Sequence, residues 1–330
     1  MIRILCTGDS HTWGQGAKGI WESLDPPPVA GDLRLTAFCH NSYVNLLRRM
    51  VEKATNSHSF EWEAPALAEL AGAPYQPPCA ALTDKTPLVI SFTGALMRFQ
   101  VKLSATPTTF SWAIDGKAQI EALPAAASDN DYRLFTCHLT EGVHTLSITV
   151  QSGTCYLYRV ESYSGTAAVI NAGVGSQPTA RYQETFWDSH VAAVKPTLVL
   201  AEAHTVNDWL SGVTPAQYEK QLVRLLTSYK QLDAAVALLT VCPIGGAQKR
   251  PDTADDFTAF VEASRRAAND ANVPLCDAHA LCSVLVADMT PDERAAYLLD
   301  DIWHPNERGH EMYAQLAAGW IAQTLSLTIF

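Results

Sequence analysis

The stretch Ile2-Arg3-Ile4-Leu5-Cys6-Thr7-Gly8-Asp9-Ser10 joins a short apolar run to a serine in the turn that follows it. An apolar run of this length is typical of a buried strand. A serine hydroxyl is a weak nucleophile at neutral pH, so it needs an adjacent base, and the base needs a third group that orients it. Asp301-Ile302-Trp303-His304, near the other end of the chain, offers a carboxylate and an imidazole three residues apart. Together the two segments supply all three groups.

From residue 166 onward, apolar runs alternate with amphipathic stretches. The apolar runs predict strands at residues 167–172, 197–202, 234–241 and 273–277. Apolar residues at helical spacing predict helices at residues 40–55, 180–194, 215–232, 253–272 and 308–325. Strands that alternate with helices imply right-handed crossovers and a parallel sheet with helices on both faces. We therefore predict an α/β fold.

Residues 87–165 differ in character from the rest of the chain. They contain short runs of alternating β-branched and aromatic residues, separated by the turn signals Asp115-Gly116, Asp129-Asn130 and Glu141-Gly142. Short strands at this spacing indicate an antiparallel β-sandwich, with a large β-hairpin decoration as the alternative. We predict that this module is inserted into a discontinuous α/β domain formed by residues 1–86 and 166–330.

Composition limits the class of protein. A chain of 330 residues fits one large domain, or one domain plus a module. Its 48% apolar and 17% charged residues are typical of a folded globular protein. The formal net charge of −11 would repel phosphate backbones, so we expect no nucleic-acid partner. No apolar run reaches the roughly 18 residues of a membrane span, so we expect no membrane partner.

The first residues lack the charged, apolar and cleavage regions of a signal peptide, so we expect a cytoplasmic protein unless a leader has been removed. Eight cysteines are scattered along the chain without a Cys-x-x-Cys pair. Such cysteines are typical of buried free thiols that pack as small hydrophobic residues. We expect no metal site and no cofactor, and the sequence leaves the oligomeric state open.

Polar clusters follow the predicted strands in a regular way. Ser10 follows the first strand, Asn171–Ser176 the second and His204–Asp208 the third, while Asp301 and His304 precede the closing helix. In open α/β sheets, ligands bind beyond the carboxyl ends of the strands. We therefore expect the four clusters to meet at one edge of the sheet.

These clusters resemble the four motif blocks of the SGNH (GDSL-type) hydrolases. Gly8-Asp9-Ser10 matches the first block, Asn171–Ser176 the second, Asn207-Asp208 the third and Asp301–His304 the last. The resemblance covers residues 1–55 and 166–330. It implies the fold of that family, which is a three-layer αβα arrangement with a mostly parallel, flavodoxin-like sheet, and it implies a serine esterase.

The resemblance also implies a role for each residue of a catalytic triad. Ser10 would attack the ester carbonyl and form an acyl-enzyme. His304 would take the serine proton and later pass it to the leaving group. Asp301 would fix the tautomer of the imidazole and stabilise the imidazolium.

An oxyanion hole is implied as well, and here the chain departs from the family pattern. The donors would be the backbone N–H of Ser10, the side-chain amide of Asn207, and the backbone N–H of either Gly175 or Ser176. The usual donor position, five residues after Asn171, is a glycine in the family and Ser176 here. The third block also carries Thr205 where a glycine is usual, two residues before its asparagine.

Several other residues lie close to these blocks in the sequence. Asp9 is expected to brace the active-site turn by accepting backbone hydrogen bonds. The residues that would line the substrate are His11, His204 and Trp303, with structural packing as the default expectation for each.

The serine chemistry does not identify which ester is the substrate. The family that the chain resembles includes carbohydrate O-acetylesterases, and β-sandwich modules attached to such domains are often carbohydrate-binding, so a carbohydrate O-acetyl ester is the first hypothesis. Aromatic residues of the module would either stack on sugar rings or form its core; they are Trp112, Tyr132, Phe135, Tyr156 and Tyr158. The alternatives are a lipid or thioester hydrolase and a non-catalytic glycan-binding protein on a hydrolase scaffold. A metal-dependent deacetylase that recruits Asp9, His11 and His304 is a further alternative, although no ligand spacing supports it. The expected partner is thus a small-molecule or oligosaccharide ester.

Overall fold

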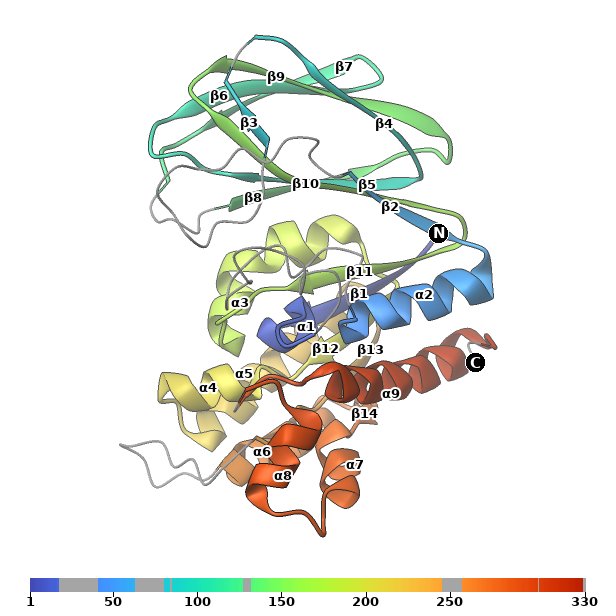
Figure 1. The fold of residues 1–330 in the computed structure, drawn as a ribbon, viewed down its shortest axis with the longest axis vertical. Helices are drawn as coiled ribbons and strands as arrows, with labels where there is room; N and C mark the ends of the chain where they lie inside the picture. Colours follow the sequence, from blue (N-terminus) through green and yellow to red (C-terminus); the bar gives the residue numbers. More distant parts are fainter. Residues whose placement is uncertain are drawn as a thin grey trace. The chain divides into compact units, whose positions relative to one another are not determined.

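The computed structural model describes residues 1–17, 41–62, 80–83, 85–126, 132–244, 257–301 and 303–328 (Figure 1). The chain divides into two compact units. The larger unit comprises Ile2–Ala54 and Val169–Phe330, and the smaller unit comprises Met1 and Thr55–Ala168.

A five-stranded sheet with the strand order β11-β1-β12-β13-β14 carries the larger unit. Its strands are β1 (Ile2–Gly8), β11 (Ala167–Gly173), β12 (Leu198–Glu202), β13 (Ala235–Leu239) and β14 (Leu275–Cys276). The pairs β1–β12, β12–β13 and β13–β14 are parallel. Every residue of β12 is buried, as in a parallel strand that is covered on both faces. The predicted parallel sheet is confirmed.

The α-helices of this unit follow the strands in the chain (Figure 1). They are α1 (Ser10–Trp13), α2 (Tyr43–Thr55), α3 (Thr179–Phe186), α4 (Thr205–Ser211), α5 (Pro215–Lys230), α6 (Phe257–Asp270), α7 (Ala278–Leu285), α8 (Pro291–Leu298) and α9 (Glu307–Leu325). α3 and α6 each pack against α5, and α7 and α8 each pack against α9.

Some helix boundaries differ from the predicted ones. The predicted helix at 180–194 is α-helical only to Phe186 and continues as a π-helix (Trp187–Val191) and a 3-10 turn (Ala192–Val194). α5 begins at Pro215, as predicted, and its N-cap is Thr214, whose side chain accepts from the backbone N–H of Gln217. Residues 253–256 of the predicted helix at 253–272 lie outside the described part of the chain. α4, α7 and α8 were not predicted, because eight residues or fewer give little periodicity.

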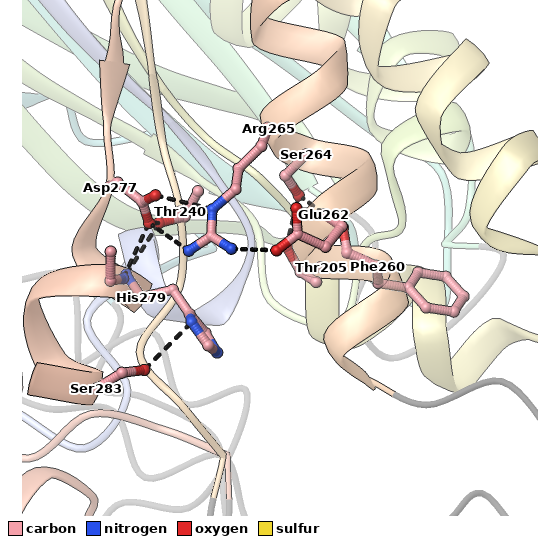
Figure 2. Close-up of polar contacts among 10 residues, drawn as sticks. Thr205, Thr240, Phe260, Glu262, Ser264, Arg265, Asp277, His279 and Ser283 are labelled. Atoms are coloured by element: carbon pink, nitrogen blue, oxygen red, sulfur yellow. Dashed lines mark hydrogen bonds and ion pairs between the residues drawn. The ribbon is translucent and has the colours of Figure 1, made fainter. Parts of the chain in front are cut away.

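A polar cluster ties α6 to the segments that follow β13 and β14 (Figure 2). The Arg265 guanidinium donates through Nε to Asp277 at 2.8 Å and also pairs with Glu262. Asp277 is the N-cap of α7, accepts from the backbone N–H of Ala280 at 3.0 Å, and accepts from the hydroxyl of Thr240 at 3.0 Å. One carboxylate thus fixes the start of α7 and the exit of β13.

The smaller unit contains two antiparallel sheets. The first has the order β2-β10-β5-β8, with β3 also paired to β10. Its strands are β2 (His58–Trp62), β3 (Ala80–Leu82), β5 (Leu96–Lys102), β8 (Tyr132–His138) and β10 (Cys155–Ser164). The second sheet has the order β4-β9-β6-β7 and consists of β4 (Leu88–Thr93), β6 (Thr108–Ile114), β7 (Lys117–Leu123) and β9 (Val143–Ser152).

Side chains from both antiparallel sheets enter one hydrophobic core, which includes Phe99 of β5, Phe110 of β6 and Ile148 of β9. β2 and β3 belong to this unit although they precede residue 87, where the predicted module begins. The predicted turn at Asp129-Asn130 lies outside the described residues.

A mixed α/β fold with a parallel sheet and separate antiparallel sheets is therefore confirmed. The exact three-layer order and the sandwich remain predictions. Within the described ranges, no helix is long and apolar enough to cross a membrane.

Candidate active site

Ser10 is held at the start of a one-turn helix directly after β1. It is the first residue of α1, and Asp9 is the N-cap, whose carboxylate accepts from the backbone N–H of His11 at 3.0 Å. Gly8 has a φ of 155°. A Cβ at Gly8 would lie 2.2 Å from the hydroxyl of Thr12 and 2.5 Å from the carboxylate of Glu202. This turn therefore requires a glycine before Asp9.

Ser10, His304 and Asp301 form a chain of hydrogen bonds. The Oγ of Ser10 lies 2.9 Å from Nε2 of His304, and Nδ1 of His304 lies 2.7 Å from Oδ2 of Asp301. Ser10 and His304 are 294 positions apart in the sequence, so the fold itself brings them together. The side chain of His304 is 12% exposed, while that of Asp301 is 43% exposed.

The charge on Asp301 decides which nitrogen of His304 carries the proton. Partial burial opposes ionisation, but hydrogen bonds from the ring and backbone of His304 and from the backbone N–H of Trp303 lower the pKa of Asp301 to about 2. The ionised carboxylate only accepts hydrogen bonds, so Nδ1 of His304 is protonated. Nε2 then presents its lone pair to the Ser10 hydroxyl, which is the arrangement of a general base and a nucleophile.

Asn207 lies in α4 and reaches back to the turn of Ser10. Its Nδ2 donates to Oδ2 of Asp9 at 2.6 Å. Because the carboxylate can only accept, this contact fixes which end of the amide faces Asp9. One N–H of the amide remains for another acceptor. Asp9 thus braces two elements, since its other oxygen caps α1.

The segment after β11 packs on α1. Asn171 is buried, donates to the backbone carbonyl of Thr12 at 3.0 Å, and accepts from the backbone N–H of Gly173. Gly175 lies beside the Trp13 ring, which a Cβ there would approach to 3.4 Å. Ser176 has a φ of 59°, in the left-handed region that favours glycine. This conformation explains why a glycine is usual at that position.

The three predicted lining residues are buried or packed against other rings. His11 is 1% exposed and contacts His304 edge-on at a ring distance of 5.5 Å, and burial lowers its pKa to about 4. His204 is fully buried, and its Nδ1 donates to the backbone carbonyl of Gln177 at 2.9 Å. The ring of Trp303 packs edge-on against Trp209 at 5.6 Å. The rings of all three residues therefore pack against other aromatic or imidazole rings.

Glu202 is a buried carboxyl group at this site that we did not predict. It is the last residue of β12 and is fully buried. Its carboxylate accepts from the backbone N–H of Asp9 at 2.9 Å and from that of His204 at 3.0 Å. The signal in the sequence is an acidic residue that ends the otherwise apolar run of β12.

A group of three of these side chains can hold a metal ion. Asp9, His11 and Glu202 are buried, and one ligand atom of each lies within 4.8 Å of the others. Their four carboxylate oxygens already accept hydrogen bonds from N–H groups. The cluster therefore needs no metal ion to satisfy its oxygens.

The sequence of the chain matches a family model. Residues 139–312, more than half of the chain, match the model of the GDSL-like lipase/acylhydrolase family. This range includes Asn171, Asn207, Asp301 and His304. No curated protein matches the chain by sequence.

Three of the solved structures that match the chain are esterases by their descriptions. A peptidoglycan O-acetylesterase structure matches over 99% of this chain and 92% of its own, with 11% identity and a TM-score of 0.55. A variant of an acetyl-xylooligosaccharide esterase from Geobacillus stearothermophilus matches over 97% and 94%, with 13% identity and a TM-score of 0.46. A family two carbohydrate esterase from Clostridium thermocellum in complex with cellohexaose matches over 74% and 94%, with 11% identity and a TM-score of 0.37.

The first of these structures shows the same fold as this chain. Because the family model spans more than half of the sequence, the chain belongs to the GDSL-like lipase/acylhydrolase family and is a carboxylic ester hydrolase.

Proposed function

We propose that the protein is a serine esterase that removes O-acetyl groups from a carbohydrate through Ser10, His304 and Asp301. The observation that carries the proposal is the hydrogen-bonded order of these side chains, with 2.9 Å between serine and imidazole and 2.7 Å between imidazole and carboxylate. These distances lie within the range that proton transfer between a nucleophile and its base requires.

The reaction proceeds in two halves. Ser10 Oγ attacks the ester carbonyl while Nε2 of His304 takes its proton, and the resulting imidazolium is stabilised by ionised Asp301. The bond between the carbonyl carbon and the sugar oxygen then breaks, His304 gives this proton to the sugar oxygen, the sugar leaves as an alcohol, and an acetyl group stays on Ser10. In the second half, His304 activates a water molecule that attacks the acetyl-enzyme, and acetate leaves as Ser10 regains its proton.

The negative charge that develops on the carbonyl oxygen needs hydrogen-bond donors. Ser10 begins α1, and the first N–H groups of a helix have no partner within it. Asn207 supplies a side-chain N–H whose orientation is fixed by Asp9. Ser176 supplies a backbone N–H from the glycine-favouring position, and Gly175 remains the alternative. Each donor is worth about 3–4 kcal/mol of barrier.

The carbohydrate substrate is supported by the fold. The peptidoglycan O-acetylesterase structure matches almost the whole of both chains, including the region of the antiparallel sheets. We place the catalytic domain in residues 1–86 and 166–330 and the module in residues 87–165, except that β2 and β3 join the module because both pair with β10.

Aromatic stacking in the module does not support a sugar platform at two of the predicted residues. Phe135 stacks on Phe99 at 4.6 Å, and Trp112 contacts Phe99 edge-on at 5.3 Å. Both side chains therefore line the core of the module.

The test is the release of acetate from a set of acetylated sugars by wild type and by Ser10→Ala. We expect turnover by wild type and its loss in the variant, because the variant lacks the proposed nucleophile. Ser228→Ala on α5, whose hydroxyl donates to a helix carbonyl of Arg224, is the matched control and should keep full activity. Activity that persists in Ser10→Ala would exclude the serine mechanism.

A series of p-nitrophenyl esters tests the acyl group. Loss of activity beyond butyrate is expected of a deacetylase, whereas a preference for octanoate would identify a lipid or thioester hydrolase. Binding of glycans without turnover of any ester would leave a binding protein on a hydrolase scaffold.

A further inference from the structure

Glu202 joins the two turns on which the proposed site is built. Its Oε2 accepts from the backbone N–H of Asp9, at the turn after β1, and its Oε1 accepts from the backbone N–H of His204, at the turn after β12. The first turn carries Ser10, and the second leads into α4 with Asn207. A single carboxyl group therefore sets the spacing between the proposed nucleophile and a proposed oxyanion donor.

A second buried carboxyl group, that of Asp9, lies next to the first. Both residues are 0% exposed, and they offer ligand atoms within 4.8 Å of each other. Asp9 accepts from the backbone N–H of His11 and from the amide of Asn207, and both contacts favour its ionised form. Two adjacent buried carboxyl groups cannot both be ionised without a compensating cation. One of the two must therefore be neutral.

The neutral member of the pair is Glu202. Burial and the neighbouring negative charge of Asp9 raise the pKa of Glu202 well above its usual value. The imidazoles of His11 and His204 also face Asp9, and burial lowers the pKa of each, so neither provides a permanent cation. A protonated Glu202 is able to donate its O–H to Asp9 while its oxygens still accept from the two backbone N–H groups.

The backbone at Gly8 packs tightly against the side chain of Glu202. A Cβ at Gly8 would lie 2.5 Å from the Glu202 carboxyl oxygen and 2.7 Å from its Cβ. The backbone of the nucleophile turn thus rests directly on this side chain, and only glycine permits the approach.

We propose that Glu202 is a positioning residue whose carboxyl group, through its contacts with the backbone N–H groups of Asp9 and His204, holds the turn of Ser10 and the turn of Asn207 at the spacing that the reaction requires. This role rests on the function proposed above. Glu202 does not touch the substrate in this scheme. It acts through Asp9, which holds both α1 and the amide of Asn207.

The test compares the kinetics of Glu202→Ala and Glu202→Gln with the wild-type enzyme. We expect kcat to fall about a hundredfold in Glu202→Ala, since a displacement of about 1 Å has this effect, while KM changes less than about threefold. Glu202→Gln keeps the size of the side chain and a donor toward Asp9, but its amide nitrogen cannot accept from a backbone N–H. It therefore keeps only one of the two turn contacts and should recover part of that loss, about tenfold. It also folds without a cavity, and therefore keeps the test valid if Glu202→Ala is unstable.

Asp277→Ala is the control for a purely structural effect. It removes a carboxylate that braces β13 and α7 but contacts neither turn (Figure 2). It should lower the midpoint of thermal unfolding without lowering kcat. An equal loss of stability with unchanged kcat in Glu202→Ala would overturn the positioning role.

Two further measurements separate this inference from its alternatives. If Ser10→Ala is inactive but both Glu202 variants keep wild-type kcat, the proposed function stands and the positioning role is wrong. If Ser10→Ala is active, both the proposed function and the positioning role of Glu202 are wrong. Infrared difference spectra should show a protonated carboxyl band that Glu202→Gln lacks. About one divalent metal ion per purified chain, lost in Glu202→Gln, would instead identify a metal site and overturn the shared proton.

Discussion

The side-chain amide of Asn207 donates to the carboxylate of Asp9 at 2.6 Å, which links the proposed oxyanion donor to the residue that precedes the proposed nucleophile. The two residues are 198 positions apart in the sequence. Asp9 is fully buried and caps α1 through its other oxygen. The orientation of the donor and that of the Ser10 turn therefore depend on one carboxylate.

This link predicts that Asn207→Ala and Asp9→Ala have effects on kcat that do not add. Asn207→Ala alone should lower kcat by about 10²–10³, as expected for the loss of one oxyanion donor. In the Asp9→Ala background the amide is no longer held, so the same substitution should cost much less. A double-mutant cycle on acetate release measures the difference. Asn269→Ala, on the exposed side of α6, should have no effect, and fully additive losses would show that Asp9 does not orient Asn207.

The charge on Asp301 predicts a specific acid dependence of stability. Its pKa in the folded protein is about 2, below the ordinary 3.8, so its interactions stabilise the fold above the ordinary value and are lost as the pH falls toward 2. We expect the unfolding free energy of wild type to fall more steeply across this interval than that of Asp301→Asn, in urea titrations at fixed pH. Asp301→Asn should also lower kcat by roughly 10⁴ at neutral pH, because the wrong tautomer of His304 then faces Ser10. Parallel stability curves for the two proteins would contradict the assignment.

The burial of His310 predicts a second loss of stability, at a higher pH than the loss that we expect from Asp301. It is fully buried, its Nδ1 accepts from the backbone N–H of Tyr43, and its Nε2–H donates to the carbonyl of Gln15. Burial lowers the pKa of His310 to about 3, although the hydrogen bond to Gln15 opposes this shift. A proton on Nδ1 would also face the N–H of Tyr43. Because the unfolded chain binds this proton first, stability should decline as the pH falls from about 6.5 toward 3, by at most about 1.4 kcal/mol per pH unit. In His310→Gln this slope should be shallower, as measured by urea unfolding.

The close contacts around Gly8 predict that no side chain fits at this position, directly before the turn of Ser10. Gly8→Ala would place a methyl group 2.2 Å from Thr12 and 2.5 Å from Glu202, at a φ of 155° that other residues rarely adopt. We expect a loss of roughly 2–4 kcal/mol in unfolding free energy, together with most of the activity. Gly319→Ala in α9 is the matched control: nothing lies within 4 Å of its Cβ, so it should stabilise the protein by about 0.5–1 kcal/mol. A tolerated Gly8→Ala would mean that the turn can move away from Glu202.

The alternation of strands and helices made much of the larger unit predictable. Polar residues after strands marked where Ser10 and Asn207 would lie, and the structure brings Ser10 to His304. Structural packing was the default expectation for His11 and His204, but the rings that pack against them were not predictable, because Tyr313 and Tyr182 are distant in the chain. Glu202 was missed because an acidic residue at a strand end is usually solvated. Its burial depends on two backbone N–H groups from different turns, and sequence patterns do not record such contacts.

Hydrogen bonds between residues of one turn connect Asp301 to His304. Asp301 accepts from the backbone N–H groups of Trp303 and His304 at 2.6 Å and 2.7 Å, and from the His304 ring at 2.7 Å. These hydrogen bonds align the carboxylate of Asp301 with the ring of His304 before any substrate binds. The hydrogen bond between Ser10 and His304 then connects this turn to the proposed nucleophile. A displacement that lengthens the contact between Ser10 and His304 would therefore break the proposed triad and still leave the hydrogen bond between Asp301 and His304 in place.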